Sequence, residues 1–336
     1  MKRKLKWLAI CLTLLLLGFG TALLLWPRDR ITPSTNAKGG EYTALEEIKS
    51  SRADFRVDKN RDGSPVISVD LSIGRVKGST LSHLEKFKEL QELYLQTNTF
   101  SDSELKHIAR LTRIRVLCLS NNVSIGDSGL RYLRDLTELR TLSLAGTSIG
   151  DKGLQDLSTL HNLEELNLAG TLMTDEGLKN LQSFSSLQKL YLNETNVGGS
   201  GLKYIGSLGK LRELYLTDTK VTKLELSSWK GLKNLTLLWL AGTPLQDSDL
   251  IELRHLPSLQ DLNLSYTGIS DAGMAHVGRL HSLKRLSIAK TKITDSGLTH
   301  LRKLHNLQKL HYGLTEITGN GIQMLKEALP NLDAYQ

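Results

Sequence analysis

Leucine recurs along this chain with a fixed period from about residue 66 onward. The unit reads LxxLxLxxTxITDxGLxxLxxLxx, and its copies lie 24 residues apart except for one step of 25. Self-similarity at such a period predicts one structural unit per copy, each stacked on its neighbours. The units begin at Val66, Leu90, Ile114, Leu139, Leu163, Leu187, Leu211, Leu235, Leu259, Leu283 and Leu307.

Each unit combines two hydrophobic patterns. The alternation in LxxLxL is typical of a short strand with one buried face. The spacing of three in GLxxLxxL suits a short helix. One strand and one helix cannot bury their apolar faces alone, so neighbouring coils must share an interior. Such a solenoid grows without a single central core, and a length of 336 residues therefore does not imply two domains.

Two polar positions recur inside this pattern. The ninth position holds Asn98 and Asn122 and then threonine from Thr147 to Thr315. A polar side chain directed inward needs partners, so we expect it to bond backbone groups where the strand turns and to link one coil to the next. The thirteenth position is usually aspartate, as in Thr294-Asp295, which predicts an N-cap followed by an acid in the first helical turn.

The tandem copies resemble the leucine-rich-repeat superfamily, in the ITDxGL type found in many bacterial envelope proteins. The resemblance covers residues 66–330 in about eleven repeats. It implies an α/β fold, a right-handed horseshoe solenoid with a concave parallel sheet and convex helices. The two cysteines, Cys11 and Cys118, do not form the cysteine-rich end caps of many animal extracellular relatives, which favours a bacterial origin. The resemblance is specific for the fold and nearly silent on the ligand.

The N-terminus contains an uncharged apolar run of 20 residues, 7–26, with tryptophan at both ends. As a helix it would span roughly 30 Å, the thickness of a bilayer's hydrocarbon core. Four cationic residues precede it, so the positive-inside rule predicts that residues 1–6 are cytoplasmic and the repeats periplasmic or extracellular. We expect a signal-anchor and a single-pass membrane protein. A cleaved signal peptide is the alternative, although its apolar region is usually shorter.

Three further segments complete the predicted organisation. Residues 27–40, rich in Pro, Ser, Thr, Gly and Asn, are expected to form a linker. Residues 41–65 are expected to form an N-terminal cap, with a helix over 41–52 and a hairpin whose second strand begins at Val66. Residues 331–336 form a C-terminal end. The turn from Asp58 to Gly63 resembles the start of a calcium loop, but Val69 stands where a bidentate glutamate is needed, so no metal site is predicted.

Aromatic residues occupy the fifth position on three consecutive strands of the predicted concave sheet. Fifth positions should face outward, and neighbouring strands lie about 4.8 Å apart, so these rings should form one row. Exposed adjacent aromatics among mixed charges fit an interface hot spot. The preference of Tyr and Trp for strands is the structural alternative. The predicted ligand-binding residues are Tyr191, Tyr215, Trp239, Leu237, Glu165, Lys189, Glu213, Asp261 and Arg285.

The remaining sequence features favour binding over catalysis. The chain has no HExxH, phosphate-binding glycine loop or CxxC pair, so no catalytic residue and no cofactor is predicted. The net charge is +8, but residues 1–30 carry +5 of it, which leaves no basic stripe for nucleic acid. We expect a membrane-anchored, non-catalytic scaffold that recognises a protein or peptide through its concave face. A structural envelope spacer and a regulatory subunit of a membrane complex are the alternatives.

Overall fold

The computed structural model describes residues 40–49, 53–72, 76–224 and 226–336. The predicted cytoplasmic N-terminus (1–6), transmembrane helix (7–26) and all but the last residue of the linker (27–40) lie outside these ranges. Across the residues that are described, no helix combines the length and the apolar character needed to cross a membrane.

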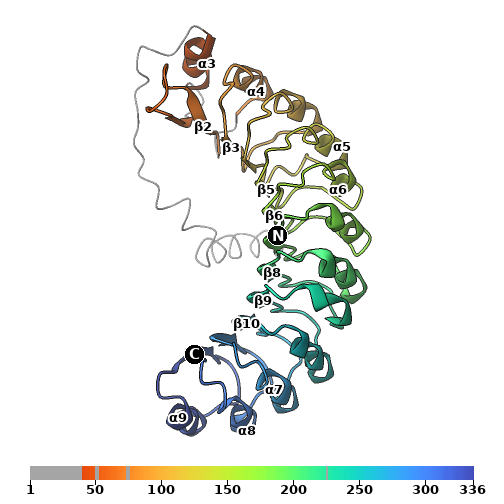
Figure 1. The fold of residues 1–336 in the computed structure, drawn as a ribbon, viewed down its shortest axis with the longest axis vertical. Helices are drawn as coiled ribbons and strands as arrows, with labels where there is room; N and C mark the ends of the chain where they lie inside the picture. The colour runs from red at the N-terminus through yellow and green to blue at the C-terminus, as the bar shows by residue number, and fades with distance from the viewer. Residues whose placement is uncertain (1–39, 50–52, 73–75, 225) are drawn as a thin grey trace, which may run out of the picture. The chain divides into compact units, whose positions relative to one another are not determined.

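The repeats form one 13-stranded sheet whose strands follow each other in sequence order. All neighbouring strands are parallel except the first pair, which is antiparallel. The strands line the inner side of the arc of coils (Figure 1). They are β1 (Asp54–Val57), β2 (Val66–Asp70), β3 (Glu92–Tyr94), β4 (Val116–Cys118), β5 (Thr141–Ser143), β6 (Glu165–Asn167), β7 (Lys189–Tyr191), β8 (Glu213–Tyr215), β9 (Leu237–Trp239), β10 (Asp261–Asn263), β11 (Arg285–Ser287), β12 (Lys309–His311) and β13 (Asp333–Tyr335).

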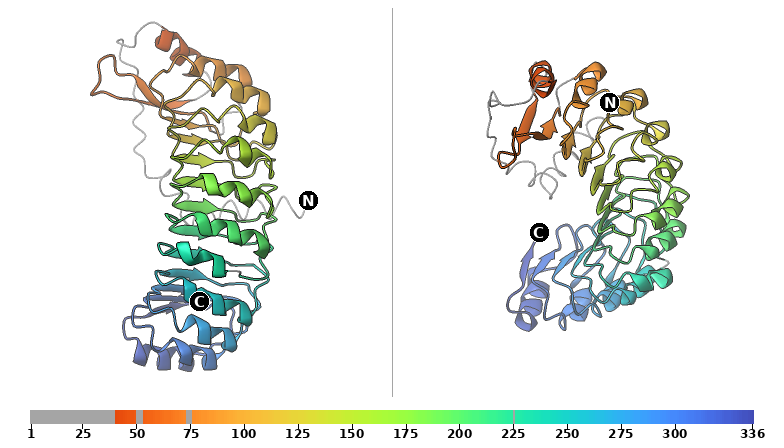
Figure 2. Two further views of the ribbon diagram at one scale, coloured as in Figure 1. Left: turned by 45° about the vertical axis from the view of Figure 1, so that its right-hand side comes forward. Right: turned by 45° about the horizontal axis from the view of Figure 1, so that its top comes forward.

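Short helices form the outer layer of the coils, as two further views show (Figure 2). Many are 3₁₀ helices rather than α-helices. Apolar residues three apart, as in GLxxLxxL, lie directly above one another at three residues per turn, which suits 3₁₀ geometry. The helices are α3 (Gly40–Lys49), η1 (Gly78–Thr80), α4 (Leu81–Leu84), η2 (Asp102–His107), α5 (Asp127–Leu130), α6 (Gly153–Asp156), η3 (Gly177–Ser183), η4 (Gly199–Ser207), η5 (Leu226–Gly231), η6 (Asp247–His255), α7 (Asp271–Val277), α8 (Asp295–Leu298), η7 (Thr299–Leu301) and α9 (Gly319–Ala328).

Leucines from successive coils fill the space between the two layers. Leu142, Leu166 and Leu190 lie side by side on adjacent parallel strands, and each is 0% exposed. Burying one such side chain stabilises the fold by roughly 1.5–3 kcal/mol. The predicted shared interior is therefore confirmed.

Both ends of the sheet extend beyond the regular repeats. At the N-terminal end, α3 buries Leu45 and Ile48, and β1 pairs antiparallel with β2. At the C-terminal end, β13 pairs with β12 and places Ala334 beside Leu310. Residues 331–336 therefore continue the sheet, whereas the sequence predicted only a terminal segment. The strand escaped prediction because Asn331, Ala334 and Gln336 replace the leucines of the repeat pattern.

The ninth-position side chains bond differently in the two coils that have asparagine and in the later coils that have threonine. Asn122 donates through Nδ2 to the carbonyls of Leu95 and Leu119 and accepts from the Phe100 amide, so it joins two coils. Thr147 donates only to the Leu144 carbonyl of its own coil, 2.6 Å away. The predicted link between coils is thus right for asparagine and wrong for threonine. A hydroxyl has one donor on a short side chain, whereas an amide has two donors and an acceptor.

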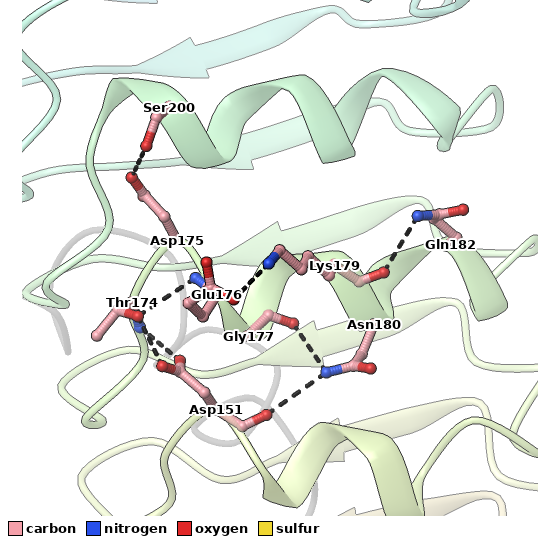
Figure 3. A network of polar contacts seen from close by, with 9 residues as sticks. All are labelled: Asp151, Thr174, Asp175, Glu176, Gly177, Lys179, Asn180, Gln182 and Ser200. Carbon is pink, nitrogen blue, oxygen red and sulfur yellow. Dashed lines mark hydrogen bonds and ion pairs between the residues drawn. The ribbon is translucent and has the colours of Figure 1, made fainter.

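The thirteenth-position aspartate supplies the link that threonine lacks. Asp151 accepts from the amide and the hydroxyl of Thr174 in the next coil, at 2.8 and 2.6 Å (Figure 3). A Cβ on Gly177 would lie 2.6 Å from Asp151 Oδ1, so glycine leaves the room that this carboxylate needs. The aspartate of ITDxGL therefore acts in the neighbouring coil as well as in its own first helical turn. The equivalent bonds join Asp102 to Gly126, Asp127 to Gly150, Asp175 to Gly198, Asp247 to Ser270, Asp271 to Thr294 and Asp295 to Thr318.

This ladder of aspartates is interrupted in the middle of the solenoid. The thirteenth position is Gly199 in one coil and Lys223 in the next, and neither has a carboxylate. There Trp229, which is fully buried, donates through Nε1 to the Leu202 carbonyl of the preceding coil at 2.6 Å. An indole from η5 thus joins the two coils where the aspartate is missing.

Candidate functional site on the inner sheet face

An aromatic row crosses three adjacent strands on the inner face of the sheet. The strand register places Tyr191 opposite Tyr215, and Tyr215 opposite Trp239. The two tyrosine rings stack with centroids 4.4 Å apart, and Trp239 meets Tyr215 at 78° with centroids 5.1 Å apart. Both arrangements are favourable for aromatic pairs. The predicted contiguous row is therefore present.

The exposure of the row differs from strand to strand. Tyr215 and Trp239 are half-buried, and Leu237 beside them is also half-buried. Tyr191 is only 7% exposed, so the expectation of an exposed ring is wrong at this position. Its ring is covered by the stacked Tyr215 on one side, with Asn167 of the preceding strand in register on the other. A partner would therefore meet mainly Tyr215, Trp239 and Leu237.

Carboxylates of the third position hold the rings in place. The Tyr215 hydroxyl donates to Glu213 Oε2 at 2.9 Å, and Trp239 Nε1 donates to Asp261 Oδ1 at 3.1 Å. Asp261 is itself buried and forms a 2.5 Å ion pair with Arg285. These bonds fix the ring orientations before any partner arrives, which lowers the entropic cost of binding.

The predicted charged residues form one row beside the aromatic row. Glu165, Lys189 and Glu213 are in register on β6, β7 and β8. Lys189 Nζ lies 3.3 Å from Glu213 Oε1. Leu237, Asp261 and Arg285 continue the same register on β9, β10 and β11. All nine predicted residues therefore lie on one contiguous surface.

Burial and neighbouring charge shift the pKa values of several groups here. Burial, followed by the charges of Glu165 and Glu213, raises the pKa of Tyr191 well above its usual value. Burial, followed by the interaction with Tyr191, does the same for Tyr215. Burial also raises the pKa of Glu165, an effect that Lys189 partly offsets and Glu213 increases. Both phenols therefore stay protonated and can donate hydrogen bonds at neutral pH.

Sequence reasoning missed one acidic residue near the row. Glu194 lies at the eighth position, just beyond the end of β7, and is half-buried. Burial raises its pKa, and the neighbouring charge of Asp218 raises it further. The signal was present in the repeat alignment, because Glu194 and Asp218 occupy the same position of consecutive units. It was missed because only the strand positions were considered as surface.

The described residues contain no group of three or more His, Cys, Asp or Glu side chains that could hold a metal ion. Cys118 is a free thiol whose pKa is raised by burial.

Comparisons with known proteins agree with the geometry of the coils. Models of the leucine rich repeat match residues 136–158, 159–181, 209–269 and 279–301. The structure of an internalin from Listeria monocytogenes is similar, with 19% sequence identity and a TM-score of 0.58. The match covers 92% of this chain and 96% of the internalin chain. A leucine-rich-repeat protein of Leptospira interrogans is 20% identical with a TM-score of 0.53, covering 76% and 74%. No curated protein matches the chain.

A TDR receptor is also similar, at 19% identity and a TM-score of 0.50, over 80% of this chain and 46% of the receptor chain. At these identities the three structures agree with the chain in fold alone.

Proposed function

The chain is a leucine-rich-repeat protein, and from that premise we propose that it is a binding scaffold that captures a protein or peptide partner on the inner face of its sheet. The observation that carries the proposal is the aromatic row. Two half-buried rings, Tyr215 and Trp239, lie next to each other and beside Leu237. Clustered Tyr and Trp side chains held in fixed orientations supply most of the affinity at many interfaces.

The clustering itself argues against strand preference as the cause. Tyr and Trp favour strands in general, and that preference would act alike on every coil. Strand preference can account for single tyrosines at the fifth position, such as Tyr94 and Tyr335, but Tyr191, Tyr215 and Trp239 fill three consecutive fifth positions between Asn167 and Asn263. The shared interior does not need the rings either, because leucines on the opposite face of each strand fill it. The row is therefore best explained by contact with a partner.

We further propose that the scaffold is held at a membrane by residues 7–26, with the N-terminus cytoplasmic and the repeats periplasmic or extracellular. The support is the charge-free run between two tryptophans and the four cations before it. In this arrangement the inner sheet face is presented outside the cytoplasm, where a secreted or surface partner can reach it.

The test is in-cell crosslinking with the full chain, followed by identification of what it captures. The Tyr215→Ala and Trp239→Ala double variant should reduce capture of the partner about thirtyfold, because hot-spot truncations cost about 2 kcal/mol or more. Met324→Ala is the control, since Met324 is 53% exposed and lies on α9 in the outer layer. Unchanged capture by the double variant would overturn the proposal. Diffuse crosslinking that neither variant alters would instead support a spacer.

A further inference from the structure

The carboxylates around the two tyrosines outnumber the cations that could neutralise them. On β6, β7 and β8 the third positions are Glu165, Lys189 and Glu213, in register. Lys189 pairs with Glu213 at 3.3 Å. Among the described residues, Glu165 has no ion-pair partner within 4 Å. This edge of the aromatic row therefore has one carboxylate more than it has cations.

The other edge of the row is acidic too. Glu194 and Asp218 follow β7 and β8, in consecutive turns where the strands end. Within the described ranges Glu194 forms no ion pair, and the neighbouring charge that acts on it is the negative charge of Asp218. Acidic side chains thus lie on both sides of Tyr191 and Tyr215, where each coil crosses the inner face.

The rings between these carboxylates suit a positive group. A cation over the face of a Tyr or Trp ring is attracted by the ring quadrupole, and more strongly when the site is partly desolvated. The Tyr215 hydroxyl donates to Glu213, and Tyr191 experiences the charges of Glu165 and Glu213. The ring faces and the neighbouring carboxylates therefore both create a negative potential beside Tyr191 and Tyr215.

We infer that coils 163–234 bind a segment of the partner that carries arginine or lysine side chains, with Glu165 and Glu194 as the groups that select the positive charge. The inference rests on the proposed function and adds the chemistry of its partner. Beyond β8 the third position offers no unpaired carboxylate up to β12, because it is Leu237, then Asp261 paired with Arg285, then Lys309, so the cation-selective surface lies on β6, β7 and β8. Both carboxylates are half-buried and therefore partly desolvated, so a nearby cation would lower the cost of holding their charge there.

The test measures peptide binding by the full chain in detergent at low salt. The probes are short fluorescent peptides of alternating Arg and Ser, and the same peptides with Gln or Glu in place of Arg. The Arg peptide should bind at least tenfold more tightly than the Gln peptide, and the Glu peptide most weakly. The Glu165→Gln and Glu194→Gln double variant should weaken Arg-peptide binding about tenfold, since two partly buried charge contacts together contribute about 1.4 kcal/mol.

The matched control removes two carboxylates from the outer layer, Asp156→Asn on α6 and Glu327→Gln on α9, both exposed. It should leave Arg-peptide binding within about twofold. Equal affinities for the Arg and Gln peptides, or equal losses in the two double variants, would overturn the inference. If the Arg peptide shows no preference but the Tyr215→Ala and Trp239→Ala double variant still loses its cellular partner, only the inferred preference for cations is wrong and the proposed function stands. Circular dichroism and the single Glu165→Gln variant separate a binding loss from unfolding.

Discussion

The eighth residue of every repeat from Leu90 onward adopts a left-handed backbone conformation. Gly146, Gly170 and Gly242 take it without steric cost, at φ of +66°, +65° and +69°. Later coils place Tyr266, Lys290 and Leu314 there, at φ of +59°, +52° and +58°. The stacking of the coils imposes this conformation whatever the residue, because the backbone amide at this position commonly bonds a carbonyl of the next coil. The Lys290 amide, for example, donates to the Gly313 carbonyl.

Replacing Leu314 with glycine should therefore stabilise the protein. Leu314 is 76% exposed, so its removal sacrifices almost no burial. A left-handed conformation costs an L-residue roughly 1–2 kcal/mol, which glycine avoids. Glycine in turn loses more backbone entropy on folding, which offsets about 0.5–1 kcal/mol of that gain. We expect a gain of about 0.5–1 kcal/mol in the free energy of unfolding, measured by urea denaturation.

The opposite change serves as the control for that experiment. Gly242→Ala should destabilise, because an added Cβ would lie 2.1 Å from Asp218 Oδ1 at a positive φ. A lower denaturation midpoint for Leu314→Gly would show that the leucine makes a stabilising contact and that the strain argument is wrong.

At the scale of the element, the turn before most outer helices is built by two coils together. The aspartate of one coil caps the next, and the glycine of the next coil makes room for it, as with Asp151 and Gly177. The TDxG part of the repeat is thus a contact between neighbours.

Gly177→Ala tests this reciprocal arrangement. The new Cβ would lie 2.2 Å from Met173 Cε, the end of a flexible side chain that can turn away. It would also lie 2.6 Å from Asp151 Oδ1 and 3.1 Å from the Asp151 Cα, so the carboxylate must move and lose its bonds to Thr174. Overpacking of this kind costs about 1–3 kcal/mol of the free energy of unfolding. The Asp151→Ala and Gly177→Ala double variant should cost clearly less than the sum of the two single changes, since both disrupt one contact. Additive losses in a double-mutant cycle would contradict the shared contact.

For the molecule as a whole, the spacing of leucines was enough to predict the strand order, the register and the shared interior. It did not reveal the aspartate ladder, because Asp151 and Thr174 are 23 residues apart and only the stacked coils bring them together. The burial of Tyr191 depends on the stacking of Tyr215 against it, which a single-strand pattern cannot show. The strand β13 was hidden by the loss of its leucines. The membrane segment stays a prediction from sequence.

The interruption of the ladder at Gly199 and Lys223 divides the solenoid into two halves. Repeat proteins have stabilities that are approximately the sum of unit terms and nearest-neighbour terms, so a weak junction lets the two sides unfold separately. At the junction after Gly199, Trp229 compensates for the missing carboxylate by filling the interior and bonding the Leu202 carbonyl. Stability across the centre of the molecule should therefore depend on this one side chain more than on any leucine.

Trp229→Ala should convert thermal unfolding from one transition into two. The substitution removes a fully buried indole, which costs about 3–5 kcal/mol, and it leaves the Leu202 carbonyl without its partner. Phe184→Ala is the control, because Phe184 is equally buried but lies in a coil joined to its neighbours by Asp151 and Asp175. Circular dichroism should show a lower midpoint for both variants and a second, separate transition for Trp229→Ala alone. A single transition in both would mean that the leucine interior by itself couples the two halves.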